Sequence, residues 1–307
     1  MESRQSQTGS SMTSFSLVDR PPAKISPDLA TARGRASDRL QLQFSADADG
    51  RTFLSRQYVA YPFHICRALY SDASSPELAT VTIQSCSGGL YEEDRLDMEV
   101  EARAGAAAHL TTQAATVVHS MPSGSAVQST RIRAEPRSYL EYLPDPLILF
   151  PQSSLVSTIN LRVSAGAVVL VSDSFLMHDP IGAGRAFATY MSEIQIEDET
   201  GRLLAIDRMA IDGATYSSRY PGVMNDFGAQ GTMIAAGTCA IPECIAGLDR
   251  IGADRGVAIG VSRLPNSAGI IVRILASDGA ALRREMHYVW SAFRRALKGG
   301  EPAPQRK

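Results

Sequence analysis

Three consecutive carboxylates, Glu92, Glu93 and Asp94, follow the pair Gly88-Gly89 in an apparent loop. Carboxylate oxygens are ligands for divalent cations, so this loop could bind a cation transiently. A solvated acidic turn is the competing interpretation, and we favour it.

Signatures of common enzyme and metal sites are absent from the sequence. It contains no GxSxG, GxGxxG, GxxxxGK[ST] or HExxH motif, so the nucleophile-elbow, dinucleotide, P-loop and zincin interpretations lack their defining residues. The histidines are dispersed, and the nearest two, His109 and His119, do not make a closed metal site. The cysteines show no zinc spacing and are expected to be buried, reduced thiols. They are Cys66, Cys86, Cys239 and Cys244.

Composition and charge indicate a globular protein without general affinity for polyanions. Of the 307 residues, 44% are hydrophobic, and 30 basic against 32 acidic residues give a net charge of -2. A chain so close to neutral does not attract phosphate backbones or anionic lipid, so nucleic-acid binding is not expected. No apolar stretch approaches the ~18 residues of a membrane span, and the N-terminus lacks the apolar core of a secretory signal. The expected location is the cytoplasm.

The elements that must position these loops are predicted to be β-strands. Segments that alternate apolar and polar residues recur along the chain, with turn sequences such as Ala104-Gly105, Ala165-Gly166 and Thr200-Gly201 between them. No amphipathic segment of helix length separates them, which argues against βαβ units. Strands are predicted at 39–44, 52–61, 78–84, 95–103, 107–112, 126–134, 139–143, 156–163, 168–175, 190–197 and 202–209.

Two of these segments share one pattern. Leu96–Gly105 and Ile159–Gly166 each form an alternating strand that ends at an Ala-Gly corner, and a more apolar strand follows each corner. Successive rungs of stacked sheets would produce this pattern. The expected fold is therefore dominated by β-structure, with β-helix-like stacked sheets. A plain β-sandwich is the alternative, and the sequence hardly separates the two.

Helix is expected only near the C-terminus. Ser277-Asp278 can cap a helix that runs to Lys298 with one apolar stripe, and this stripe is expected to pack on the sheets. A hairpin at 256–264 and 269–276 precedes it, and a shorter helix is predicted at Pro242–Leu248. Residues 1–37 and 299–307 have the composition of disordered tails. Residues 38–298 are therefore predicted to form a single strand-rich domain.

Four phrases, in order, resemble one known family. Ser87–Leu96 has a Gly-Gly pair before an acidic turn, Leu110–Thr116 reads Leu-Thr-Thr-Gln-Ala-Ala-Thr, and Leu140–Ile148 contains Leu-Glu-Tyr-Leu-Pro. Gly269–Ala276 is an apolar strand that precedes a helix containing Trp290. Together they resemble the UreD family of urease accessory proteins, collinearly from about Arg39 to Leu297.

The sequence departs from the pattern of this family at two places. Glu93 stands where the family has the glycine of a Gly-Asp pair, and because glutamate is costly at positive φ, a different backbone conformation is expected in this turn. Val117-Val118 replaces a lysine-containing stretch, which removes a basic residue from the rim of the loop. Both changes concern the loop surface and leave the predicted fold as it is.

The resemblance implies a strand-rich scaffold that binds apo-urease and recruits UreF and UreG. It does not decide whether this complex is a dimer. It implies GTP-dependent insertion of nickel into urease, with an internal route for the ion, no enzymatic reaction by the chain itself and no tightly bound cofactor. Nickel would be handled transiently, because a closed site of high affinity would trap it. Scattered oxygen and nitrogen donors would serve this purpose without leaving a compact motif.

On this basis a small set of polar residues is proposed to bind partners or to pass the ion. Each also has an ordinary explanation: β-propensity for the threonines, a proline-turn cap for Asp145, and a hydrogen-bonded buried carboxylate for Asp173. The candidates for partner binding or ion passage are Glu92, Glu93, Asp94, Thr111, Thr112, Gln113, Thr116 and Asp145, and the weak, transient nickel candidates are Asp173 and His178.

An enzyme is the second hypothesis. A β-helix or sandwich could act on a polymer through paired carboxylates drawn from Asp94, Asp145 and Asp173. This hypothesis requires two of these carboxyl groups within roughly 5–10 Å of each other in an open groove.

Overall fold

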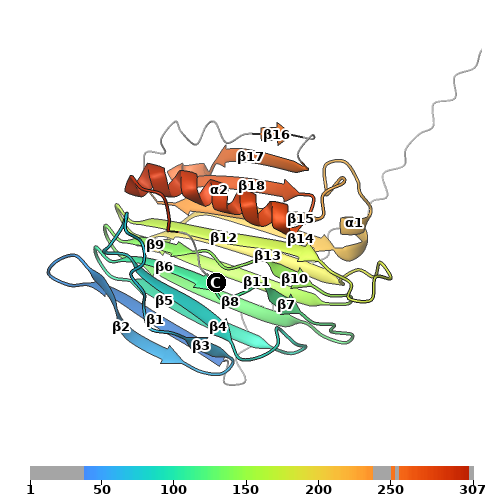
Figure 1. Ribbon diagram of the computed structural model, residues 1–307, viewed down its shortest axis with the longest axis horizontal. Helices are drawn as coiled ribbons and strands as arrows, with labels where there is room; N and C mark the ends of the chain where they lie inside the picture. The colour runs from blue at the N-terminus through green and yellow to red at the C-terminus, as the bar shows by residue number, and fades with distance from the viewer. Residues whose placement is uncertain (1–37, 238–249, 253–255, 304–307) are drawn as a thin grey trace, which may run out of the picture. The chain divides into compact units, whose positions relative to one another are not determined.

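The computed structural model of the protein describes residues 38–237, 250–252 and 256–303, and within these ranges the chain forms two β-sheets and two α-helices (Figure 1). Sheet A has the order β14-β13-β11-β8-β5-β1-β2. Sheet B has the order β16-β17-β18-β15-β12-β9-β6-β4-β3, and outside this order β10 pairs with β12 and β7 pairs with β10. The strands of sheet A are β1 (Asp38–Ala46), β2 (Thr52–Val59), β5 (Arg95–Ala102), β8 (Ala126–Ala134), β11 (Ser154–Val163), β13 (Thr189–Asp198) and β14 (Leu203–Asp212). The strands of sheet B are β3 (Phe63–Ile65), β4 (Ala79–Ser85), β6 (Ala107–Thr112), β7 (Thr116–Val118), β9 (Tyr139–Tyr142), β10 (Leu147–Leu149), β12 (Val168–Met177), β15 (Ala229–Ala236), β16 (Arg250–Gly252), β17 (Val257–Arg263) and β18 (Gly269–Ala276).

The central strands form stacked coils. From β4 to β13 the chain alternates between the two sheets, and each strand pairs in parallel with the strand of the next coil. Leu96, for example, lies opposite Gln128, and Ser157 lies between Gln128 and Ser192. The prediction of β-helix-like stacked sheets is therefore confirmed, and the sandwich alternative describes the topology less well.

The two ends of the coils differ. At the corner end, four-residue corners carry the chain from sheet A to sheet B, and Gly105 and Gly166 adopt φ values of 75° and 72° there, where a side chain would be strained. At the loop end, longer segments carry it from sheet B to sheet A; they are residues 86–94, 113–125, 143–153 and 178–188. The Ala-Gly pairs thus mark corners, as the sequence pattern predicts.

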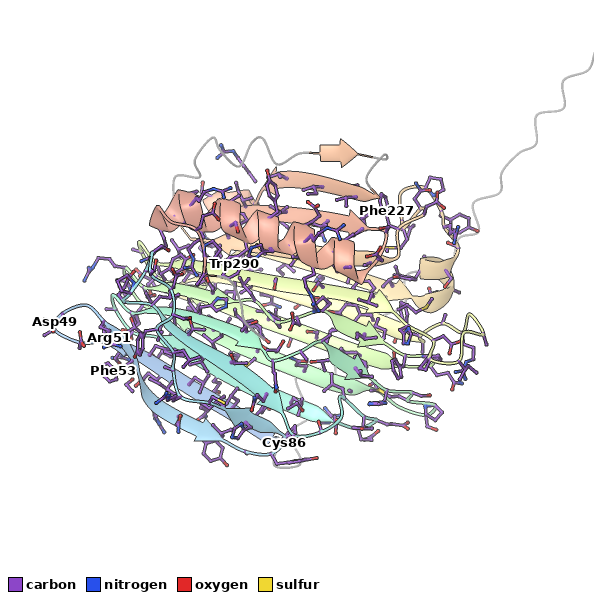
Figure 2. All side chains as sticks on the ribbon, viewed as in Figure 1. Asp49, Arg51, Phe53, Cys86, Phe227 and Trp290 are labelled. Atoms are coloured by element: carbon purple, nitrogen blue, oxygen red, sulfur yellow. The ribbon has the colours of Figure 1, made fainter. Side chains whose placement is uncertain are left out.

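Helix α2 (Gly279–Lys298) covers the outer face of sheet B, where it contacts β15 and β18. The Asp278 side chain caps it by accepting hydrogen bonds from the backbone N–H groups of Ala280 and Ala281, each 2.8 Å long. Trp290 lies on the side of the helix toward the sheets (Figure 2). The predicted helix and its packing role are therefore confirmed. Helix α1 (Gly213–Ser217), which follows β14, was not predicted.

Other expectations met different outcomes. Cys66 and Cys86 are free thiols but exposed, so the prediction of buried thiols is wrong for them. Cys239 and Cys244 lie outside the described residues, as do the helix predicted at 242–248 and the tail predicted at 1–37. Strand β15 was not predicted, because Gly231 interrupts its apolar pattern. Glu301 belongs to the tail predicted at 299–307, and its carbonyl oxygen accepts a hydrogen bond from the Ser74 hydroxyl. Among the described helices, none combines the length and apolarity that crossing a membrane requires.

Candidate functional site

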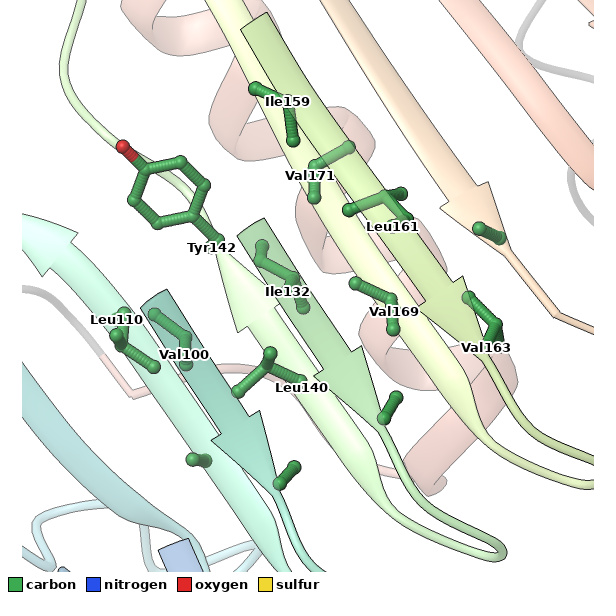
Figure 3. Close-up of a cluster of buried hydrophobic side chains, with 14 of the residues drawn as sticks. Val100, Leu110, Ile132, Leu140, Tyr142, Ile159, Leu161, Val163, Val169 and Val171 are labelled. Carbon is green, nitrogen blue, oxygen red and sulfur yellow. The ribbon is translucent and has the colours of Figure 1, made fainter. Parts of the chain in front are cut away.

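A layer of polar side chains lies between the two sheets from β8 to β14 in sheet A and from β9 to β18 in sheet B. Toward the corner end lies an apolar cluster that includes Val100, Ile132, Leu161 and Val171 (Figure 3). Toward the loop end lies a second cluster, which includes Phe175. Strand alternation places the following polar residues on the inner faces between these clusters, and we call them the polar layer: Gln128, Thr130, Tyr142, Ser157, Asp173, Ser192, Asp207, Thr232 and Arg273.

Asp173 is the central carboxylate of the polar layer. It lies on β12 between Val171 and Phe175, which belong to the two apolar clusters. The hydroxyl of Tyr190 donates a hydrogen bond of 2.6 Å to Asp173 Oδ1, so this contact joins sheet A to sheet B. Burial raises the pKa of Asp173, as does the Asp207 carboxylate, whereas Ser192, Tyr190 and the Arg273 guanidinium act in the opposite direction.

Two tyrosine hydroxyls stay neutral beside this carboxylate. Burial raises the pKa of Tyr142 to about 12, and burial together with the Asp173 charge raises the pKa of Tyr190 well above its usual value. Thr130 and Gln128 share hydrogen bonds with the Tyr142 side chain. Both tyrosines therefore act as hydrogen-bonding groups and not as bases near neutral pH.

The polar layer contains oxygen atoms that could bind a cation with moderate strength. Its donors are carboxylate, hydroxyl and amide oxygens, and it contains neither thiolate nor imidazole. Within the described residues, no three or more His, Cys, Asp or Glu side chains gather in a way that could hold a metal ion. Oxygen donors of this kind bind borderline transition metals less firmly than nitrogen or sulfur donors do. The layer is therefore suited to contact an ion in passing.

The threonines of the candidate loop surface have structural partners at the loop end. Thr111 Oγ1 donates to the Leu143 carbonyl oxygen at 2.9 Å, and Thr112 Oγ1 accepts from the Asp145 backbone N–H at 2.9 Å. The backbone N–H of Thr116 bonds the Pro146 carbonyl oxygen. These residues thus join one coil to the next. Gln113 is exposed beside them.

The acidic residues 92–94 form hydrogen bonds at the same end of the coils, but with residues 123–125 and with their own turn. Glu92 Oε1 accepts from the backbone N–H of Ser123 at 2.9 Å, and the Glu93 N–H donates to the Ser125 carbonyl oxygen at 3.2 Å. Asp94 Oδ2 accepts from the Tyr91 N–H at 2.7 Å and closes the turn. The acidic run and the threonines therefore lie at one end of the coils but have different neighbours.

Asp173 and His178 do not form one metal site. Asp173 faces the interior, whereas His178 is exposed after the end of β12 and lies beside Phe150, with ring centroids 5.8 Å apart. Five extended residues span roughly 16 Å, and an odd separation places side chains on opposite faces. Strand geometry thus separates two residues that are close in sequence.

The three carboxylates of the enzyme hypothesis occupy different environments. Asp94 closes a turn, and Asp173 lies between the sheets. Asp145 lines a pocket between α2 and the 143–146 loop, together with Arg283 and Trp290. They do not face a common groove, so the geometry does not support paired-carboxylate catalysis.

Glu93 gives a test of backbone strain in the acidic loop. Its φ is 69°, so the turn has the left-handed conformation that glycine would adopt, and the expectation of a different backbone is not met. Because an L-residue is strained there, Glu93→Gly is expected to raise the free energy of unfolding by about 0.5 kcal/mol. The control is Glu92→Gly, which has ordinary φ and should destabilise. Urea denaturation measures both, and destabilisation by Glu93→Gly would contradict the argument.

Most of the polar layer was missed by sequence reasoning. Ser157 and Ser192 stand at inward positions where neighbouring alternate residues are Leu155, Ile159 and Ile194. A polar residue that interrupts the apolar half of an alternating strand was the available signal. Only Asp173 was recognised, because it is a charged residue that follows an apolar run.

Comparison with known proteins supports a family assignment. The family model of the UreD urease accessory protein matches residues 36–307. A protein of Methylorubrum extorquens named "Urease accessory protein UreD 1" is 42% identical over 294 residues, which cover 95% of this chain and 98% of that protein. One of the same name from Pseudomonas syringae pv. syringae is 40% identical over 271 residues, or 87% of this chain and 94% of that protein. Since the family model spans nearly the whole chain and these relatives are 40% and 42% identical over most of their length, the chain belongs to the UreD family of urease accessory proteins.

Proposed function

We propose that this chain is a cytoplasmic scaffold of urease maturation. It binds apo-urease, recruits UreF and UreG, and takes part in GTP-dependent insertion of nickel without catalysing a reaction itself. Nickel is the cargo and contacts the polar layer on its way to urease. The observation that carries this proposal is the polar layer around Asp173 inside a fold that would otherwise be filled with apolar side chains.

The cost of the polar layer supports a functional role. Hydroxyl and amide groups taken out of water each cost about 1–3 kcal/mol unless they are hydrogen-bonded, and the polar layer avoids this cost only through hydrogen bonds such as that of Tyr190 to Asp173, whereas aliphatic side chains would need none. Aliphatic residues at the same inward positions would join the two apolar clusters into one core. Burial also disfavours the charged form of Asp173 and raises its pKa. A passage for a hydrated cation explains why such groups stand there.

The weakness of the donors also fits a passage. An ion in transit must be released as readily as it is taken up, so donors that act in sequence serve better than a closed site. The layer extends across successive coils, from Thr130 and Gln128 through Ser157 and Ser192 to Asp207. Such a row offers an ion successive oxygen contacts along the axis of the coils.

Co-expression tests the scaffold role. Urease subunits and the other accessory proteins would be produced with and without this chain, and the urea-hydrolysing activity and nickel content of purified urease would be measured. Affinity purification through a tag on this chain should recover apo-urease, UreF and UreG. We expect activation only when the chain is present. Full activation and full nickel content in its absence would overturn the proposal.

A further inference from the structure

An ion pair joins the two sheets at the margin of the polar layer. The Arg273 guanidinium of β18, in sheet B, bonds the Asp207 carboxylate of β14, in sheet A. The Arg273 side chain is 44% exposed and the Asp207 side chain 16% exposed. The pair therefore lies where the interior meets solvent.

This pair is connected to the central carboxylate. Arg273 lies opposite Thr232, and Thr232 lies opposite Asp173, so the three residues occupy neighbouring positions on one inner face. Arg273 Nη1 also donates to Thr232 Oγ1 at 3.3 Å. Both Arg273 and Asp207 act electrostatically on Asp173. The guanidinium thus stands between solvent and the two inward carboxylates.

We infer that Arg273 limits how firmly the polar layer retains a metal ion, as an exchangeable counter-ion that occupies Asp207 until a divalent cation displaces it. This inference rests on the proposed passage of nickel. While Arg273 pairs with Asp207, the carboxylates of Asp173 and Asp207 cannot both bind one cation tightly. The polar layer therefore does not retain the ion. An ion pair this exposed is weak, and the guanidinium can leave Asp207 at little cost.

The charge of Arg273 has a predictable effect on metal affinity. A positive charge at hydrogen-bond distance from a carboxylate reduces the attraction of that carboxylate for an incoming cation, and solvent screening of the half-exposed Arg273 limits the reduction. Removing it frees Asp207 to act with Asp173. Retention of the ion then increases, and delivery to urease falls.

Binding of Ni²⁺ to the purified full-length chain tests this inference by calorimetry. Arg273→Gln is expected to lower the Kd for Ni²⁺ by about fivefold, which is the upper end for an ion pair this exposed. Arg273→Lys, which keeps the charge, should stay near wild type, and Asp207→Asn should not bind more tightly than wild type. Arg133→Gln is the matched control, because Arg133 is exposed on the outer face of sheet A. Thermal unfolding of each variant separates altered binding from altered folding.

The outcomes separate this inference from the proposed function. A Kd for Arg273→Gln within twofold of wild type would overturn the role of Arg273 and leave the passage proposal standing. Equal tightening by Arg273→Gln and Arg133→Gln would also overturn it, since the effect would then be one of net charge. Failure of the passage proposal itself is read from urease activation by variants of Asp173.

Discussion

Replacement of Asp173 by asparagine is expected to reduce urease activation by at least about tenfold while leaving the folded protein no less stable than wild type. The variant removes the charge at the centre of the polar layer and keeps nearly the same shape. An amide oxygen can still accept the hydrogen bond that Tyr190 donates. Loss of activation would then come from loss of the charge that attracts the cation.

The stability of this variant follows from the direction of the pKa shift. Burial raises the pKa of Asp173 in the folded state above its unfolded value. The ionised form is therefore disfavoured by folding, and wild-type stability falls as pH rises from the unfolded pKa through the folded one. Asparagine has no such dependence, so Asp173→Asn should gain stability relative to wild type near neutral pH.

Two measurements check this prediction together. Activation is read as the activity and nickel content of urease co-expressed with the variant, and stability as the midpoint of thermal unfolding at several pH values. Asp97→Asn is the matched control, because Asp97 is on the outward-facing side of β5. Full activation by Asp173→Asn would contradict the passage through the polar layer. A marked loss of stability would instead make Asp173 a structural residue.

Local signals made the coiled-sheet architecture predictable. Strand alternation, the Ala-Gly corners and the Asp278 cap each depend on a few adjacent residues, and β5, β11 and α2 lie close to their predicted ranges. The short strands β7 and β10 have too few residues to show a period. The acidic and threonine segments could be assigned to loops and strand ends, but not to their partners.

The polar layer and the contacts between coils depend on contacts between residues that are far apart in the sequence. His109 seemed closest to His119, which is ten residues away, yet it bonds Glu141 of the next coil and stacks on Trp290 of α2. Ser157 and Ser192 become neighbours only through the parallel register of β11 and β13. The register that brings residues of different strands together was the information that the sequence lacked.

Loss of the Arg294 guanidinium is expected to destabilise the fold by about 3–5 kcal/mol, because it leaves buried carboxylates without their counter-ion. Arg294 belongs to α2 and is 1% exposed. Its guanidinium bonds Glu141 through Nε at 2.8 Å and Nη2 at 2.6 Å, and Asp72 through Nη1 at 2.6 Å. Tyr139 and Trp290 also donate to Glu141. Arg294→Met keeps the length of the stem and removes only the charged group.

The pH dependence of stability gives a second signature of the same network. Burial alone would raise the pKa of Glu141, but hydrogen bonds with His109 and Arg294 lower it to about 2. Because the folded pKa lies below the unfolded one, this stabilisation is complete above the unfolded value, near 4.5, and is lost as pH falls toward 2. Arg294→Met should weaken this acid dependence.

Arg295, the exposed neighbour of Arg294, is the control that separates the effect of removing a buried charge from the effect of removing any charge. Arg295 pairs with Glu301 at the surface, so Arg295→Met is expected to cost less than about 0.5 kcal/mol. Denaturant unfolding of both variants measures the difference, and a loss below about 1 kcal/mol for Arg294→Met would contradict the argument. The double variant Glu141→Leu with Arg294→Met removes both charges and should recover part of the loss. Such recovery would show that the network fixes α2 on sheet B through the mutual dependence of its charges, since neither charge is tolerable there without the other.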